Sequence, residues 1–233
     1  EDMWDSIKRE ARNVRQNVGM CDVSTLGKID VQGPDALEFI QRLYSNGMKT
    51  LPVGKVRYGL MLREDGHVMD DGTVARVGEN HYYVTTTTAK AGPVMAHLEF
   101  YLDVVWPELK VRVASITDQW AAMSIAGPNA RKLLERGFDA DLVSNEALPF
   151  MGFVDTSLNG CPVRIMRISF SGELAYEIHT PANHGLFVWT KMMELGQALG
   201  LQPYGVEALS ALRLEKGHVA GGDLHGNATA ADM

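Results

Sequence analysis

The sequence predicts an α+β fold made of two duplicated αβ units, in which helices pack on mixed or antiparallel sheets. Three observations support this prediction. Short strand patterns alternate with amphipathic helix patterns along the chain. The order strand, Gly-Pro, Ala, helix occurs at residues 29–40 and again at residues 123–134. An Asp-Gly dipeptide between two strand patterns indicates an antiparallel hairpin.

The first elements follow from hydrophobic spacing. Residues 2–18 carry apolar side chains at helical spacing, and residues 28–31 alternate polar and apolar side chains as a half-buried strand does. Pro34 breaks this strand and suits the first turn of a second helix. That helix carries Ile40 and Leu43 on one face.

A hairpin and a further strand come next. Strands over 56–62 and 68–77 flank the Asp-Gly dipeptide, which is the strongest short signal for a hairpin. Thr and Tyr residues give the segment 81–88 strong β character. A helix is expected over 89–101, where apolar side chains recur in helical register.

The second half repeats this order of elements. After the second Gly-Pro segment, strands are expected over 163–169 and 174–180, followed by a helix over 184–195. We therefore interpret the chain as a first αβ unit over 1–115 and a second αβ unit over 116–233. No Pro- or Ser-rich linker separates them, so both are expected to share one packed body. Chance recurrence of a common helix-start pattern is the alternative explanation.

Composition excludes several classes of protein. The chain of 233 residues has a net charge of −7, which argues against a nucleic-acid-binding surface spread over the whole chain. No apolar run is long enough to span a membrane. Cys21 and Cys161 lack the number and spacing of a disulfide framework or a metal site, and the seven His residues form no metal-binding pair. We expect no metal and a reduced, cytoplasmic setting.

A pair of carboxylates is the first candidate for chemistry. Asp70 and Asp71 follow the predicted hairpin turn on one strand. Neighbouring side chains on a strand point to opposite faces, so only one of the two can face a given pocket. That carboxylate would bind an amine or act in acid–base chemistry. A solvated strand end is the alternative.

Two further charged residues are candidates for binding. Glu177 lies between Tyr176 and Ile178 on an otherwise apolar strand, where a carboxylate needs a partner or a polar ligand. A heterocycle with neighbouring N–H donors would suit it, and an exposed position on an amphipathic strand is the alternative. Arg213 lies near the end of an apolar helix that Gly217 would cap. It would pair a carboxylate, either of a ligand or of the protein itself.

Several segments resemble a known family, the folate-binding aminomethyltransferases, whose founding member is the T-protein of the glycine cleavage system. The segments that carry this resemblance are residues 21–28, 33–36, 66–71 and 213–215. Within that family, a closer resemblance is to the C-terminal part of the α subunit of heterotetrameric sarcosine oxidases. It rests on residues 85–88, 118–121, 167–177 and 212–217.

The resemblance implies both a fold and an activity. It implies a tetrahydrofolate-binding domain that captures the one-carbon unit from oxidative demethylation of sarcosine as 5,10-methylenetetrahydrofolate. The partners would be the flavin-bearing β subunit and the γ and δ subunits. Flavin and NAD would bind in other parts of the full enzyme. The family's small C-terminal β-barrel is expected to be absent, because this sequence stops at Met233.

The resemblance also assigns roles to single residues. Asp71 matches the functional Asp of the family, which assists proton transfer, and Glu177 matches its pterin-binding Glu. Tyr58 matches an aromatic residue that lines the folate pocket. Phe170 replaces a Tyr, so stacking is retained while a hydroxyl hydrogen bond is lost. Arg213, in the matching Arg-Leu-Glu segment, is a further candidate for the cofactor site.

Other functions stay open from the sequence. The chain would be a non-catalytic assembly module of a flavin amine oxidase or dehydrogenase if it bound its partner but no folate. It would be a T-protein-like aminomethyltransferase if a lipoyl carrier supplied the carbon, although Leu209 stands where T-proteins have Arg. The related iron–sulfur maintenance proteins carry a Cys after the helix-ending Lys-Gly, and His218 stands there instead.

Overall fold

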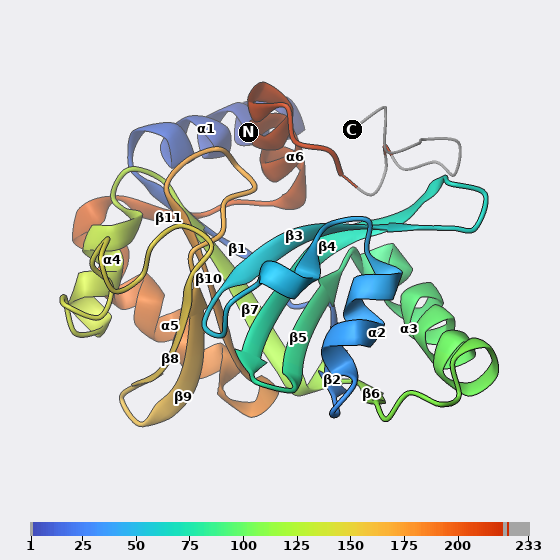
Figure 1. The fold of residues 1–233 in the computed structure, drawn as a ribbon. Coiled ribbons are helices and arrows are strands. Elements are labelled where there is room, and N and C mark those ends of the chain that lie inside the picture. The colour runs from blue at the N-terminus through green and yellow to red at the C-terminus, as the bar shows by residue number, and fades with distance from the viewer. Residues whose placement is uncertain (1, 221–222, 224–233) are drawn as a thin grey trace. The chain divides into compact units, whose positions relative to one another are not determined.

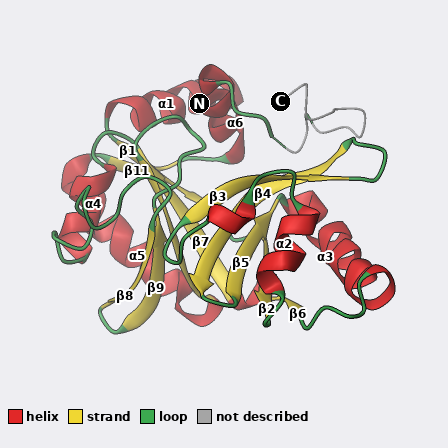
Figure 2. Ribbon diagram, in the orientation of Figure 1, coloured by secondary structure: helices red, strands yellow, loops and turns green. Residues whose placement is uncertain are grey.

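The computed structural model describes residues 2–220 and 223 (Figure 1). The chain divides into two compact units. One unit comprises, among the described residues, 2–24 and 118–218, and is called here the six-stranded unit. The other comprises, among the described residues, 25–117, 219–220 and 223, and is called here the five-stranded unit. Each unit combines a sheet with helices (Figure 2), as an α+β fold requires.

The six-stranded unit contains a mixed sheet with the strand order β11-β1-β7-β10-β9-β8. Its strands are β1 (Val18–Asp22), β7 (Trp120–Ala126), β8 (Phe153–Leu158), β9 (Cys161–Met166), β10 (Ala175–Pro181) and β11 (Leu201–Pro203). Its helices are α1 (Met3–Gln16), α4 (Ala130–Gly137), α5 (Gly185–Gly196) and α6 (Val206–Lys216). Only the β1–β11 pairing is parallel, so the prediction of a mixed or antiparallel sheet is confirmed here.

Both faces of this sheet are covered by helices. Met20, Ile125 and Tyr176 point to the face that packs against α4 and α5. Their neighbours Cys21 and Ala126 alternate to the opposite face, where they meet residues of α1 and α6. The sheet is therefore the buried centre of the unit, and β10 carries Glu177 through it.

The five-stranded unit contains an antiparallel sheet with the strand order β3-β4-β5-β2-β6. Its strands are β2 (Gly27–Gln32), β3 (Val56–Leu62), β4 (Val68–Gly78), β5 (His81–Thr86) and β6 (Arg112–Ser115). Its helices are α2 (Ala36–Leu43) and α3 (Ala91–Phe100), and a π-helical turn, Tyr101–Val105, extends α3. Figure 2 shows β3 and β4 side by side as the predicted hairpin.

The contacts do not follow the expected boundary at residues 115 and 116. Residues 1–24 lie in the same unit as residues 118–218. The reason is strand pairing, because β1 lies between β7 and β11. The N-terminal helix also ends before residue 18: Asn17 leaves the helical conformation, and the Asn13 side chain donates a 2.8 Å hydrogen bond to the Val18 carbonyl.

The two Gly-Pro segments form corners of the same geometry. Gly33 and Gly127 have φ of +148° and +135°, values that favour glycine. In each corner the amide of the first helical residue, Ala36 or Ala130, donates a 3.0 Å hydrogen bond to the glycine carbonyl. This match is what an internal duplication predicts, and the duplication itself stays a prediction.

Candidate functional site

The β3–β4 hairpin brings Tyr58 and Asp71 together. The register pairs Leu60 with Asp71 and Tyr58 with Thr73, so these side chains share one face of the hairpin. The Tyr58 hydroxyl donates a 2.9 Å hydrogen bond to Oδ2 of Asp71, which is its diagonal neighbour across the two strands. The two residues to which the resemblance assigns proton transfer and ligand packing are therefore in direct contact.

The second oxygen of Asp71 is available for another donor. Oδ1 is buried and has no hydrogen-bond partner among the described residues. Burial raises the pKa of Asp71, and the hydrogen bond from Tyr58 opposes that rise. A buried carboxylate oxygen without a donor is costly, so this arrangement suits a ligand that brings an N–H or O–H group.

Asp70 faces the other way and has a structural role. It is 2% exposed, and Thr87 donates two hydrogen bonds to it, from the hydroxyl at 2.7 Å and from the backbone amide at 3.1 Å. Burial raises the pKa of Asp70 to about 6. The expectation that only one of the two carboxylates can serve a given pocket agrees with these separate environments.

Glu177 lies on β10, with its side chain 14% exposed. Its Oε2 lies 3.0 Å from Nε2 of His179, a fully buried residue on the same face of the strand. The register places Glu177 beside Ser124 of β7 and Met166 of β9. The carboxylate is thus mostly buried and is held on one side by a neighbouring imidazole. This burial does not fit the alternative of a water-exposed position on an amphipathic strand.

Phe170 and Arg213 meet at a third residue, His218. Nδ1 of His218 lies 3.0 Å from the Phe170 carbonyl oxygen, and the two rings are stacked with centroids 6.0 Å apart. Nη1 of Arg213 donates a 3.1 Å hydrogen bond to the His218 carbonyl. Gly217, with φ of +84°, ends α6 between them, so the predicted C-cap is confirmed.

The five candidate residues thus form two groups. Tyr58 and Asp71 belong to the five-stranded unit. Glu177, Phe170 and Arg213 belong to the six-stranded unit. Within the part of the chain that the structure describes, no cluster of three or more His, Cys, Asp or Glu side chains is arranged to hold a metal ion.

A comparison with known families decides the relationship. The model of the GCVT N-terminal domain matches residues 1–233. The chain belongs to this family. The resemblance to aminomethyltransferases and to sarcosine oxidase α subunits is thereby confirmed, and individual relatives of the GCVT domain agree with it.

Two curated relatives of this GCVT domain illustrate the match. It is 53% identical over 236 residues to "Sarcosine oxidase subunit alpha" of Rhizobium meliloti (strain 1021), with all of the chain and 24% of that relative aligned. It is 34% identical over 224 residues to "Aminomethyltransferase" of Halothermothrix orenii, with 96% of the chain and 59% of that relative aligned. The chain therefore spans about a quarter of the first protein and about three fifths of the second.

Solved structures support the same fold. The crystal structure of glycine cleavage system aminomethyltransferase T from Bartonella henselae matches with a TM-score of 0.79 at 25% identity, over 92% of this chain and 55% of that one. A chain of heterotetrameric sarcosine oxidase from Corynebacterium sp. U-96, in complex with pyrrole 2-carboxylate, matches with a TM-score of 0.57 at 17% identity, over 92% of this chain and 95% of that one. The second likeness concerns the fold alone.

Two residues of this GCVT domain were not among the sequence candidates. His179 follows Glu177 by two positions on a strand, and this spacing alone places both side chains on one face, so the pair was visible in the sequence. His218 was not, because its contacts with Phe170 and Arg213 depend on how the end of α6 packs.

None of the described helices is long and apolar enough to cross a membrane.

Proposed function

We propose that this GCVT domain binds tetrahydrofolate and loads a one-carbon unit onto it, giving 5,10-methylenetetrahydrofolate. The carbon would come from oxidative demethylation of sarcosine in an assembly with a flavin-bearing β subunit and with γ and δ subunits, in the cytoplasm. Flavin and NAD would bind outside this segment. The 53% identity to a sarcosine oxidase α subunit over the whole chain supports this choice of assembly.

The observation that carries the proposal is the state of Asp71. One carboxylate oxygen accepts the Tyr58 hydroxyl, and the other is buried without a donor among the described residues. Tetrahydrofolate supplies the two nitrogens between which the carbon is held. As a nitrogen forms its bond to the carbon it must lose a proton, and Oδ1 of Asp71 would accept it. The aromatic ring of Tyr58, 40% exposed beside Asp71, would pack on the ligand.

Glu177 would hold the pterin. A carboxylate accepts two parallel hydrogen bonds from neighbouring N–H groups. It can therefore distinguish a heterocycle that carries such a pair of N–H groups, as a pterin does, from a heterocycle that lacks the pair. The contact between His179 and Oε2 fixes the orientation of the Glu177 carboxylate, and therefore also the direction in which Oε1 points. Phe170 would add stacking, and Arg213 would pair a ligand carboxylate.

Calorimetric titration with 5-formyltetrahydrofolate, a stable reduced folate, tests the binding. We expect the parent chain to bind, Glu177→Gln to lose binding, and Glu135→Gln, which alters an exposed carboxylate of α4, to bind as the parent does. Asp71→Asn should bind nearly normally but form the methylene product at least about 100-fold more slowly. Absence of binding to the parent chain would contradict the proposal and favour an assembly module.

The aminomethyltransferase relatives support a second candidate, transfer from a lipoyl-carried aminomethyl group. The two functions differ in the carbon donor. Product formation from a lipoyl-carried donor, and none from the imine or formaldehyde released on sarcosine oxidation, would favour the second candidate.

A further inference from the structure

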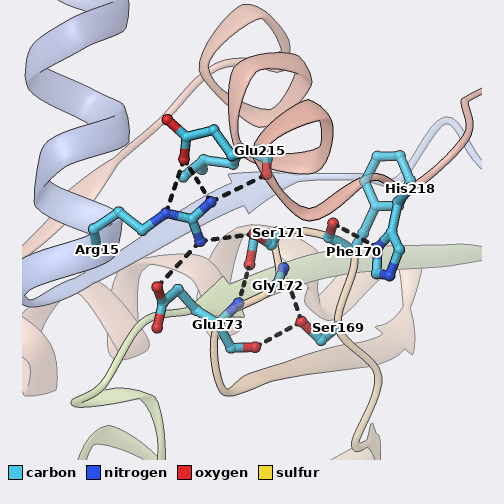
Figure 3. Close-up of polar contacts among 9 residues, drawn as sticks. Arg15, Ser169, Phe170, Ser171, Gly172, Glu173, Glu215 and His218 are labelled. Carbon is cyan, nitrogen blue, oxygen red and sulfur yellow. Dashed lines mark hydrogen bonds and ion pairs between the residues drawn. The ribbon is translucent and has the colours of Figure 1, made fainter.

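The guanidinium of Arg15 joins three segments of the six-stranded unit. Arg15 lies in the last turn of α1, between the turn formed by residues 169–173 and the end of α6 (Figure 3). Its Nη1 donates to the Ser171 carbonyl at 2.8 Å, and its Nη2 donates to the Leu212 carbonyl at 3.1 Å. One side chain thus holds backbone groups of two segments that are far apart in the sequence.

The same guanidinium separates two carboxylates. Nη1 lies 3.1 Å from Oε1 of Glu173, and Nη2 lies 2.7 Å from Oε2 of Glu215. The Glu215 side chain is 62% exposed, so this ion pair by itself contributes little to stability. Removing the cation has a larger consequence, because it leaves two like charges around one position and takes a donor from the Ser171 carbonyl.

Other contacts, within the turn and with α6, also hold the 169–173 turn in one conformation. The Ser169 hydroxyl donates to the Glu173 carbonyl at 2.6 Å and accepts from the Gly172 amide at 3.2 Å. Gly172 has φ of +85°, and a Cβ there would lie 2.9 Å from Cβ of Lys216. The turn therefore packs closely on the end of α6. Arg15 adds a second link between them, because it donates to the Ser171 carbonyl of the turn and to the Leu212 carbonyl of α6 (Figure 3).

The residues fixed in this way are candidates for ligand binding. Phe170 lies in the turn and stacks on His218, as Figure 3 shows, and Arg213 donates to the His218 carbonyl. The turn also leads directly into β10, which carries Glu177. A displacement of the turn would move Phe170 and the start of β10 together.

We infer that Arg15 is a positioning residue of the reduced-folate site: it holds the 169–173 turn against α6 and so presents Phe170 and Arg213 to the ligand. The inference rests on the proposed function, because it names the residue that orders part of that site. A planar guanidinium is required, since Nε and Nη2 both donate to Glu215 while Nη1 donates to the Ser171 carbonyl, and a lysine ammonium cannot donate from three nitrogens in this fixed arrangement.

Hydrogen–deuterium exchange in the full chain tests the structural half. In Arg15→Ala we expect amides of residues 169–173 and 213–218 to exchange about tenfold faster or more, with those of β9 unchanged. Arg15→Lys should show a smaller increase. Arg12→Ala, which changes an exposed arginine one helical turn earlier, should exchange like the parent. Unchanged exchange of the turn in Arg15→Ala would overturn the inference.

Titration with 5-formyltetrahydrofolate tests the positioning half. We expect Arg15→Ala to raise the Kd about tenfold while the binding stoichiometry stays near that of the parent. A purely structural role would instead lower the fraction of chains that bind and leave their Kd unchanged, and that result would overturn the inference while leaving the proposed function intact. Absence of binding to the parent chain would refute the proposed function itself, and the exchange data would then describe a structural clamp only.

Discussion

Nε2 of His179 lies 3.0 Å from Oε2 of Glu177, two residues earlier on the same strand. The imidazole is fully buried, so it is a fixed partner rather than a mobile surface group. It restrains the carboxylate to one orientation before any ligand arrives. Preorganisation of this kind lowers the entropy lost on binding.

His179→Leu should therefore weaken binding of the reduced folate about tenfold, which is about 1.4 kcal/mol. Leucine fills a similar volume but makes no hydrogen bond to Glu177. His179→Gln is the matched variant, because its amide can donate to the carboxylate and should retain most of the affinity. Titration calorimetry on both variants decides the matter, and equal affinities would show that the imidazole does not orient Glu177.

Tyr58→Phe should move the pH profile of methylene-folate formation. The Tyr58 hydroxyl stabilises the charged form of Asp71, so its removal raises the pKa of Asp71 further. If Asp71 accepts the proton, the rate rises with pH as Asp71 ionises, and this rising limb should shift to higher pH in the variant. The ring is retained, so folate affinity at high pH should change little.

The measurement is the rate of product formation against pH, corrected for the uncatalysed reaction. Asp71→Asn provides the control, since it should lack the rising limb altogether. A profile that is the same in the parent and in Tyr58→Phe would exclude Asp71 as the group responsible.

Asp70 should make the protein less stable as the pH rises. Its pKa is raised from 3.8 to about 6 in the folded state, so the folded state holds the proton more tightly than the unfolded state. The free energy of unfolding therefore loses about 3 kcal/mol from this group between those two pH values, and the loss persists above them. Asp70→Asn removes the titration, while its amide and carbonyl can still bond both Thr87 groups.

Urea unfolding of the parent and of Asp70→Asn at several pH values measures this difference. The variant should gain stability relative to the parent as the pH rises through that range. Asp103→Asn, which alters an exposed carboxylate of the same unit, should follow the parent. A constant difference between the parent and Asp70→Asn would show that Asp70 is not responsible.

Local signals in the sequence predicted most of the elements but not how they associate. The strand over 56–62 and the C-cap at Gly217 are confirmed because hydrophobic spacing and glycine positions report local conformation. Strand β6, three of whose four residues are exposed, and β11, only three residues long, were missed because neither has a hydrophobic pattern of its own. Only Val18 of strand β1 falls in the predicted helix over 2–18, and the rest of this strand was not predicted, because its place depends on pairing with β7 and β11.

The candidate site shows the same division. Alternation on a strand separates Asp70 from Asp71 and was readable in the sequence. The hydrogen bond from Tyr58 to Asp71 depends on the pairing register of the hairpin. A bulge between Met61 and Leu62, nearer the turn, changes that register, and the sequence does not predict it. Arg15 gave no signal at all, because a basic residue near the end of an amphipathic helix is ordinary.

The corner at Gly127 gives a stability prediction for the six-stranded unit. A Cβ at this residue would lie 2.5 Å from the Asn17 carbonyl oxygen and 2.7 Å from that of Val14, and its φ is +135°. These neighbours are backbone atoms where α1 ends and β1 begins, and the Asn17 carbonyl already accepts a 3.0 Å hydrogen bond from the Asn129 amide. Gly127→Ala should therefore cost about 2–6 kcal/mol, from backbone strain and overpacking together.

Gly160→Ala separates these two causes. Gly160 has φ of +84°, but a Cβ there would meet nothing within 4 Å, so only the cost of the left-handed conformation remains, about 1–2 kcal/mol. Urea unfolding of both variants measures the difference. An equal loss in the two would mean that α1 and β1 yield to the added methyl group, and that the close approach of Asn17 to Gly127 does not hold the N-terminal segment against β7.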